Sequence, residues 1–99
     1  MSFYMLHPKD LETVRKQKNA IVVDVRDGAE YYKWRYCNVV WRPYCDDESW
    51  MNWFGKGQCY ILYCDYGNIS LLVARKLAQR DITAYTVVGG ARELKRYTL

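Results

Sequence analysis

The chain has 99 residues, of which 51% are hydrophobic and 26% are charged, and its formal net charge at pH 7 is +4. This length and composition predict one globular domain over residues 1–99 and exclude both a disordered chain and two independent cores. The sequence has neither an apolar run of roughly 18 residues nor a secretory signal pattern, which predicts a cytoplasmic protein with no membrane partner.

Segments of helical and of strand character alternate along the chain. In chain order we expect a surface helix over residues 11–19, a strand over 20–25, a helix opening at Asp27 and a strand over 38–41. There follow a helix over 49–54, a strand over 59–64, a helix over 70–80, a strand over 84–88 and a helix over 91–97. This alternation favours the α/β class, with a parallel sheet covered by helices on both faces.

Two of the expected helices carry more specific signals. Asp27 is a plausible N-cap, with Glu30 three residues later as in a capping box. Trp50, Trp53 and Phe54 fall on one face of the helix over 49–54. We interpret this aromatic face as core packing or a lid on the sheet rather than a ligand platform.

The four cysteines, Cys37, Cys45, Cys59 and Cys64, contain no CxxC pair. This spacing argues against a structural zinc site and against a thioredoxin-type redox motif, so we expect no metal. Three of the four are interpreted as ordinary buried or half-buried side chains. The exception is Cys64.

Distinctive residues lie at the ends of three predicted strands. They are Asp24, Val25 and Arg26 at the first end, the segment 64–70 at the second, and Gly89 and Gly90 at the third. Ligands of open parallel sheets bind outside the carboxyl ends of the strands. We therefore expect these three segments to converge on one edge.

Cys64 ends its strand, and the next helix is expected to start at Ser70. Gly67 lets the intervening backbone curl, and the amide N–H groups of such a loop can point inward at an anion. The helix adds positive potential at the same place. A thiol at the centre would be held as its thiolate, so we interpret Cys64 as a reactive cysteine.

Five short motifs, in order and spacing, resemble a single-domain rhodanese-like sulfurtransferase. They are Val23-Asp24-Val25-Arg26, Glu30-Tyr31, Pro43, Tyr63-Cys64 followed by Gly67, Asn68 and Ser70, and Val88-Gly89-Gly90. Each motif is weak alone, but together they cover residues 20–94 in register.

The resemblance implies a rhodanese-like α/β fold with a five-stranded parallel sheet and helices on both faces. It implies that Cys64 is catalytic: it takes sulfur from a small anionic donor such as thiosulfate and passes it on from a persulfide. The acceptor would be cyanide or a thiol, which can belong to a protein, and no cofactor is needed. By position, the substrate-binding residues would be Asp65, Tyr66, Gly67, Asn68, Ile69 and Ser70. Loop support would come from Asp24, Arg26, Glu30, Gly89 and Gly90, with a buried Arg26–Glu30 pair bracing the loop.

The residues also bear on three functions other than sulfur transfer. A phosphatase of related loop pattern needs Arg where this chain has Ser70, which disfavours that activity. Asp65 and Ile69 occupy positions where basic residues are common in the family. These substitutions also favour a second hypothesis, a catalytically weak or inactive domain that serves in interaction or regulation. A redox sensor would need a second thiol from Cys37 or Cys45.

The basic runs over residues 15–18 and 92–96 are typical of solvated helix ends, where cations suit the helix dipole. We therefore do not expect nucleic acid as a partner.

Overall fold

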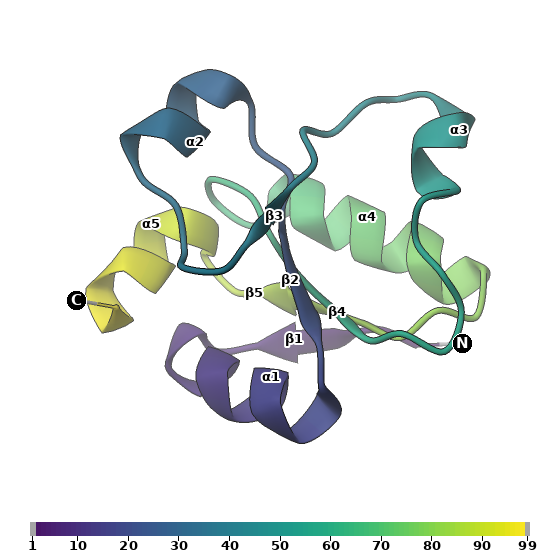
Figure 1. Cartoon of the computed structure of the whole chain (residues 1–99), viewed down its shortest axis with the longest axis horizontal. Helices are drawn as coiled ribbons and strands as arrows, with labels where there is room; N and C mark the ends of the chain where they lie inside the picture. Colours follow the sequence, from purple (N-terminus) through teal and green to yellow (C-terminus); the bar gives the residue numbers. More distant parts are fainter. Residues whose placement is uncertain (1, 99) are drawn as a thin grey trace.

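The computed structural model describes residues 2–98 and contains a five-stranded parallel sheet with the order β1-β5-β4-β2-β3 (Figure 1). The strands are β1 (Tyr4–Leu6), β2 (Ile21–Asp24), β3 (Val40–Trp41), β4 (Tyr60–Tyr63) and β5 (Ala84–Val87). The helices are α1 (Leu11–Lys18), α2 (Gly28–Lys33), α3 (Glu48–Met51), α4 (Asn68–Gln79) and α5 (Gly90–Leu94). Short 3-10 turns cover Pro8–Asp10 and Lys95–Tyr97. This architecture confirms the predicted α/β fold class.

Two hydrophobic cores lie on opposite faces of the sheet. Val23 and Leu62 pack with residues of α3 and α4 on one face, and Val22 and Ile61 pack with residues of α1 and α5 on the other. Figure 1 shows α4 above the strands and α1 below them. The central strand β4 is buried along its whole length, because both of its faces are covered, and its sequence is accordingly apolar without alternation.

The register of the strands brings their carboxyl ends to one edge. Asp24 of β2 pairs with Tyr63 of β4, and the amide of Val25 donates to the carbonyl of Tyr63 at 3.1 Å. On the other side of β4, Leu62 pairs with Thr86 of β5. The segments that follow β2, β4 and β5 therefore emerge beside one another, as the sequence predicts.

Three elements differ from the sequence-based expectation. Strand β1 was not predicted from the residues themselves, because it has only three residues and just one of them is buried. Helix α4 begins at Asn68 rather than Ser70, so its first turn belongs to the loop after Cys64. Helix α3 is a single turn, and its aromatic face is divided: Trp50 and Phe54 are buried, whereas Trp53 is 43% exposed.

The expected cap of α2 is confirmed, since the Asp27 carboxylate accepts a hydrogen bond from the Glu30 amide at 3.1 Å. The expectation for two cysteines is wrong. Cys37 and Cys45 are exposed, because both lie in connecting segments outside the helices and strands.

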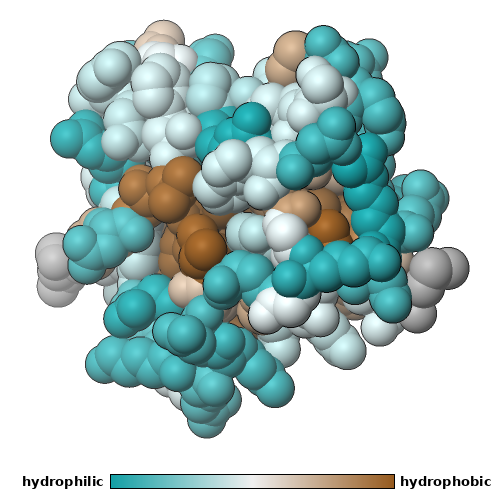
Figure 2. Space-filling view, turned by 45° about the vertical axis from the view of Figure 1, so that its right-hand side comes forward, coloured by the Kyte–Doolittle hydropathy of each residue, from teal (hydrophilic) through white to brown (hydrophobic). Residues whose placement is uncertain are grey.

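The face seen in Figure 2 is largely polar, with apolar side chains gathered in recessed areas between polar rims. Within residues 2–98, no helix is both long and apolar enough to span a membrane.

Candidate active site

The sulfur of Cys64 lies at the start of the loop that joins β4 to α4. Two backbone amides donate to Cys64 Sγ, that of Gly67 at 3.1 Å and that of Ser70 at 3.3 Å. Two oxygen atoms lie within reach of the thiol proton, Ser70 Oγ at 3.5 Å and Asn68 Oδ1 at 3.8 Å. Cys64 is only 3% exposed, so the sulfur is held among the polar groups of its own loop.

Gly67 gives this loop its curl. Its φ of +108° is in the region that favours glycine, and a Cβ there would lie 3.3 Å from the amide nitrogen of Gly89. Gly67 also precedes the first residue of the twelve-residue helix α4. The amides of a helix start lack partners within the helix, and here the amide of Ser70 is directed to the sulfur.

Two buried hydroxyl groups, those of Ser70 and Thr86, lie near the sulfur. Ser70 and Thr86 are 0% and 1% exposed, and their side-chain oxygens are 2.7 Å apart. Thr86 is not among the site residues predicted from the sequence. The signal available was that Thr86 is the one aliphatic hydroxyl in the otherwise apolar strand over 84–88.

The start of α5 holds the loop from the other side. The amide of Ala91 donates to the carbonyl of Cys64 at 2.7 Å, and the amide of Arg92 donates to that of Asp65 at 3.2 Å. Gly90 makes this approach feasible, because its φ is +63° and a Cβ there would overlap the backbone of Cys64 and Asp65. Gly89 and Gly90 thus lie against the loop.

Arg26 forms a buried ion pair, but with Asp24 rather than with Glu30. Its guanidinium donates to both Asp24 carboxylate oxygens at 2.8–3.1 Å, and its backbone amide donates to the same carboxylate at 2.9 Å. Glu30 instead pairs with Lys33 at 3.3 Å near the surface. The predicted Arg26–Glu30 pair is therefore wrong. Asp24 is closer to Arg26 along the chain than Glu30 is, and its side chain is as fully buried as that of Arg26. Asp24 can therefore bind the guanidinium with both of its carboxylate oxygens.

Aromatic rings complete the surroundings of Arg26. Its guanidinium carbon lies 5.7 Å from the ring centroid of Trp34 and 5.4 Å from that of Tyr63. Burial alone would lower the pKa of Arg26, but the hydrogen bonds and charge of Asp24 raise it above its ordinary value. Arg26 is therefore a fixed positive charge at the sheet edge.

Asp65 links the loop to Arg26, since its carboxylate lies 3.7 Å from Arg26 Nη1. Burial raises the pKa of Asp65, the Arg26 charge lowers it, and neighbouring carboxylates raise it, with a net upward shift. Tyr66 is 67% exposed, with the Arg92 guanidinium 6.0 Å from its ring centroid, and the half-buried Ile69, in the first turn of α4, packs against the core. Of the six predicted substrate-binding residues, Gly67, Asn68 and Ser70 lie within hydrogen-bond reach of the sulfur in the described structure, whereas Asp65, Tyr66 and Ile69 form no hydrogen bond with it.

Comparison with solved structures identifies the fold. A rhodanese-like domain protein of Staphylococcus aureus superposes with a TM-score of 0.80 and 25% identity, covering 92% of this chain and 90% of that one. A rhodanese-related protein of Thermoplasma volcanium superposes with a TM-score of 0.83 and 23% identity, covering 96% and 93% of the two chains. This chain is a rhodanese-like domain.

The sequence is also similar to part of a longer protein. It is 32% identical over 80 residues to a tRNA sulfurtransferase of Pyrobaculum aerophilum, a match that covers 81% of this chain. The rhodanese-like domain spans only 16% of the length of that relative. No protein-family model matches the sequence.

Two further arginines of the rhodanese-like domain lie over aromatic rings. The guanidinium of Arg35 lies over the ring of Tyr31 at 4.9 Å. That of Arg42 lies over Trp53 at 4.7 Å and over Trp50 at 5.0 Å, and burial lowers the pKa of Arg42. Arg26, in contrast, lies within 3.7 Å of the carboxylate of the loop residue Asp65.

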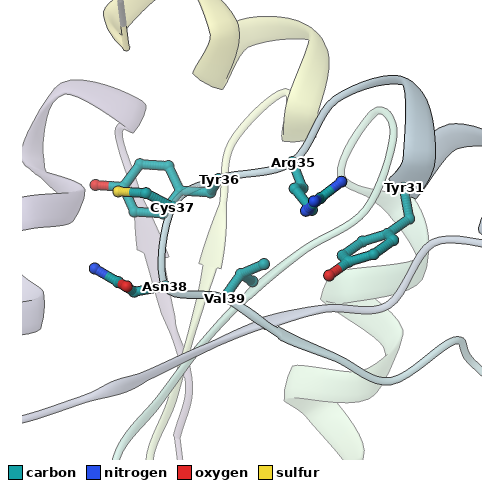
Figure 3. Close-up of a pocket in the computed structure, with 6 residues that line it drawn as sticks. All are labelled: Tyr31, Arg35, Tyr36, Cys37, Asn38 and Val39. Carbon is teal, nitrogen blue, oxygen red and sulfur yellow. The ribbon is translucent and has the colours of Figure 1, made fainter.

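A hollow of about 410 Å³ lies on the segment between α2 and β3 (Figure 3). Its lining includes Tyr31, Arg35 and the exposed Cys37, and none of the residues that contact the Cys64 sulfur. We therefore separate this hollow from the candidate active site. Within the described residues, no group of three His, Cys, Asp or Glu side chains could hold a metal ion.

Proposed function

We propose that this rhodanese-like domain is a sulfurtransferase that works through a persulfide on Cys64. The observation that carries the proposal is the pair of backbone amides, from Gly67 and Ser70, that donate to the Cys64 sulfur. Hydrogen bonds from amides favour the anionic form of sulfur, and the thiolate is the nucleophile in sulfur transfer. The similarity to proteins named tRNA sulfurtransferase supports the same class of reaction.

In the first step, the Cys64 thiolate attacks the outer sulfur of thiosulfate. A sulfur–sulfur bond forms to Cys64, the sulfur–sulfur bond of the donor breaks, and its electron pair leaves with sulfite. In the second step, the thiolate of an acceptor attacks the outer sulfur of the persulfide. The Cys64 thiolate then departs, so the two steps are balanced without an external oxidant or reductant.

The negative charge moves outward from Cys64 Sγ to the outer sulfur when the persulfide forms. The amides of Gly67 and Ser70 donate to Cys64 Sγ, and in this proposal the outer sulfur is held by the same loop. Fixed dipoles of this kind stabilise a charge without having to reorient during the reaction. The loop has no basic side chain of its own between residues 64 and 70, so these amides take on that role.

The predicted supporting residues divide into two groups in this proposal. Gly89 and Gly90 let the start of α5 approach the loop, and Asp24 holds Arg26 beside it. Arg26 is the positive charge that attracts a small anionic donor and partly balances Asp65. Glu30 does not brace Arg26, because it pairs with Lys33 instead.

Thiocyanate formation from thiosulfate and cyanide tests the proposal. We expect turnover by the wild-type protein, loss of turnover in Cys64→Ala and retention in Cys59→Ala. Cys59 is a matched control, because it directly precedes the first residue of β4, whereas Cys64 directly follows the last. Burial raises the pKa of the Cys59 thiol. Retained turnover in folded Cys64→Ala would contradict the proposal. No turnover by the wild type with either thiosulfate or a persulfide donor would favour the interaction module.

A further inference from the structure

Thr86 and Ser70 form a chain of two buried hydroxyl groups that leads to the Cys64 sulfur. Thr86 Oγ1 lies 2.7 Å from Ser70 Oγ, and Ser70 Oγ lies 3.5 Å from Cys64 Sγ. Ser70 Oγ is also 3.3 Å from the carbonyl oxygen of Gly67. Among the described residues, Ser70 Oγ is the only hydrogen-bond partner of the Thr86 hydroxyl.

Counting protons fixes the direction of this chain. Each hydroxyl has one proton to donate. If Ser70 donated to Thr86, the Thr86 proton would be buried without an acceptor, which is costly. Thr86 therefore donates to Ser70. The Ser70 proton is then left for one of two acceptors, the Gly67 carbonyl or the Cys64 sulfur.

We propose that Thr86 is a positioning residue, which orients the Ser70 hydroxyl so that it donates to Cys64 when the sulfur is a thiolate. In the thiol form, the sulfur can donate to Ser70 Oγ, and Ser70 donates to the Gly67 carbonyl. When the thiol loses its proton to water, the sulfur becomes an acceptor. The Ser70 proton then turns from the carbonyl to the sulfur while Thr86 continues to donate to Ser70.

This inference rests on the proposed function, because it assigns Thr86 a role toward the thiolate of Cys64. It adds a residue of β5, outside the loop, to the groups that favour that thiolate. The charged groups near the loop are Asp24 at the end of β2, Arg26 after it, Asp65 beside Cys64 and Arg92 in α5, together with Asp27 and Glu30, whose charges act on Asp65. Replacing the Thr86 hydroxyl by a methyl group changes none of these charges.

The test is the pH dependence of alkylation of Cys64 by iodoacetamide, followed by peptide mass spectrometry so that each cysteine is measured separately. The exposed Cys37 in the same sample reports any general effect of pH on the reagent. Thr86→Val keeps the shape of the side chain and removes its hydroxyl, whereas Thr86→Ser keeps the hydroxyl. Thr83→Val is the matched control, since Thr83 is exposed and precedes β5 at its opposite end.

We expect Thr86→Val to raise the midpoint of the Cys64 pH–rate profile by about 0.5–1 pH unit, which is a roughly three- to tenfold loss of reactivity below the midpoint. Thr86→Ser should restore most of the shift, and Thr83→Val should cause none. Because Thr86 acts through Ser70, Thr86→Val should add little to Ser70→Ala when the two are combined.

An unchanged midpoint in folded Thr86→Val would overturn the inference, as would a shift of the same size in the Ser70→Ala background. If Thr86→Val does not fold, Ser70→Ala alone decides, because an unchanged midpoint in that variant removes the last link of the chain. The alkylation assay needs no sulfur donor. Failure of the proposed function would be seen separately, as absence of sulfur transfer by the wild type.

Discussion

Gly90 lies so close to Cys64 that a Cβ on Gly90 would stand 2.4 Å from the Cys64 carbonyl oxygen. The adjacent amide of Ala91 donates to this same oxygen at 2.7 Å. The carbonyl of the candidate nucleophile is therefore fixed by the turn that follows β5. The position of the sulfur depends on a glycine that lies in another element and never contacts the sulfur itself.

Gly90→Ala is expected to lower the free energy of unfolding by about 2–4 kcal/mol and to slow sulfur loading of Cys64. The cost combines a left-handed φ of +63° with a clash against backbone, which cannot move aside. Gly57→Ala is the control, because Gly57 has a φ of +84° but nothing within 4 Å of the added Cβ. It should cost only about 1 kcal/mol. If chemical denaturation showed that Gly90→Ala and Gly57→Ala lower the free energy of unfolding equally, the proposed clash would be refuted.

Asp24→Asn is expected to destabilise the protein by about 3 kcal/mol or more, because it leaves Arg26 buried without its carboxylate. Both side chains of this pair are almost fully buried, with 1% exposure for Arg26 and 0% for Asp24. Glu93→Gln breaks a surface pair with Arg96 and should cost less than about 1 kcal/mol. Denaturant unfolding measures both changes, and a small loss for Asp24→Asn would show that the buried pair contributes little.

Asp65→Asn is expected to stabilise the protein slightly at neutral pH but not in acid. Burial raises the pKa of Asp65 above its ordinary value of 3.8, so folding disfavours the charged carboxylate. Below the ordinary pKa of 3.8 the carboxyl is mostly protonated in both folded and unfolded chains, so most of the penalty disappears. The penalty grows as the pH rises from that value to the folded pKa, and it is constant above the folded pKa. The gain should stay below about 1 kcal/mol, because the side chain is 41% exposed and screened. Unfolding at about pH 7 and about pH 3.5 measures the difference, and a gain independent of pH would count against this cause.

Asp65→Asn should also speed the reaction with thiosulfate, because it removes a negative charge beside Cys64 while Arg26 remains. Asp81→Asn makes the same change of net charge in the turn that precedes β5, at the opposite end of the strands, and should not alter this rate. The rate of sulfite release at low and high ionic strength separates the two variants. A similar rise in both would assign the effect to net charge rather than to position.

Much of the fold could be predicted because its signals are local. The apolar run of β4 and the helical spacing of α4 each lie within one segment, and strands alternating with helices dictate parallel pairing. Strand β1 carries no such signal, because its pairing with β5 depends on residues far along the chain. The start of α4 at Asn68 follows from the curl at Gly67, which the helical pattern alone does not specify.

The candidate site could be predicted in part for the same reason. The loop from Cys64 to Ser70 is a contiguous motif, so its amides and its glycine can be read from neighbouring residues. The partner of Arg26 is a different kind of question, since Asp24 and Glu30 are both close in sequence and only the packing of the guanidinium decides between them. The contact of Thr86 with Ser70 joins two elements, and no local pattern reveals it.

The most direct test of the account is the mass of the intact protein after incubation with thiosulfate, with Cys64→Ala treated in parallel. We expect the wild-type protein to gain one sulfur atom, which peptide mapping assigns to Cys64 and which cyanide removes. The Cys64→Ala variant should gain none. A sulfur gained equally by both proteins, or no gain by folded wild-type protein whose Cys64 is reduced, with thiosulfate and with a persulfide donor alike, would contradict the account.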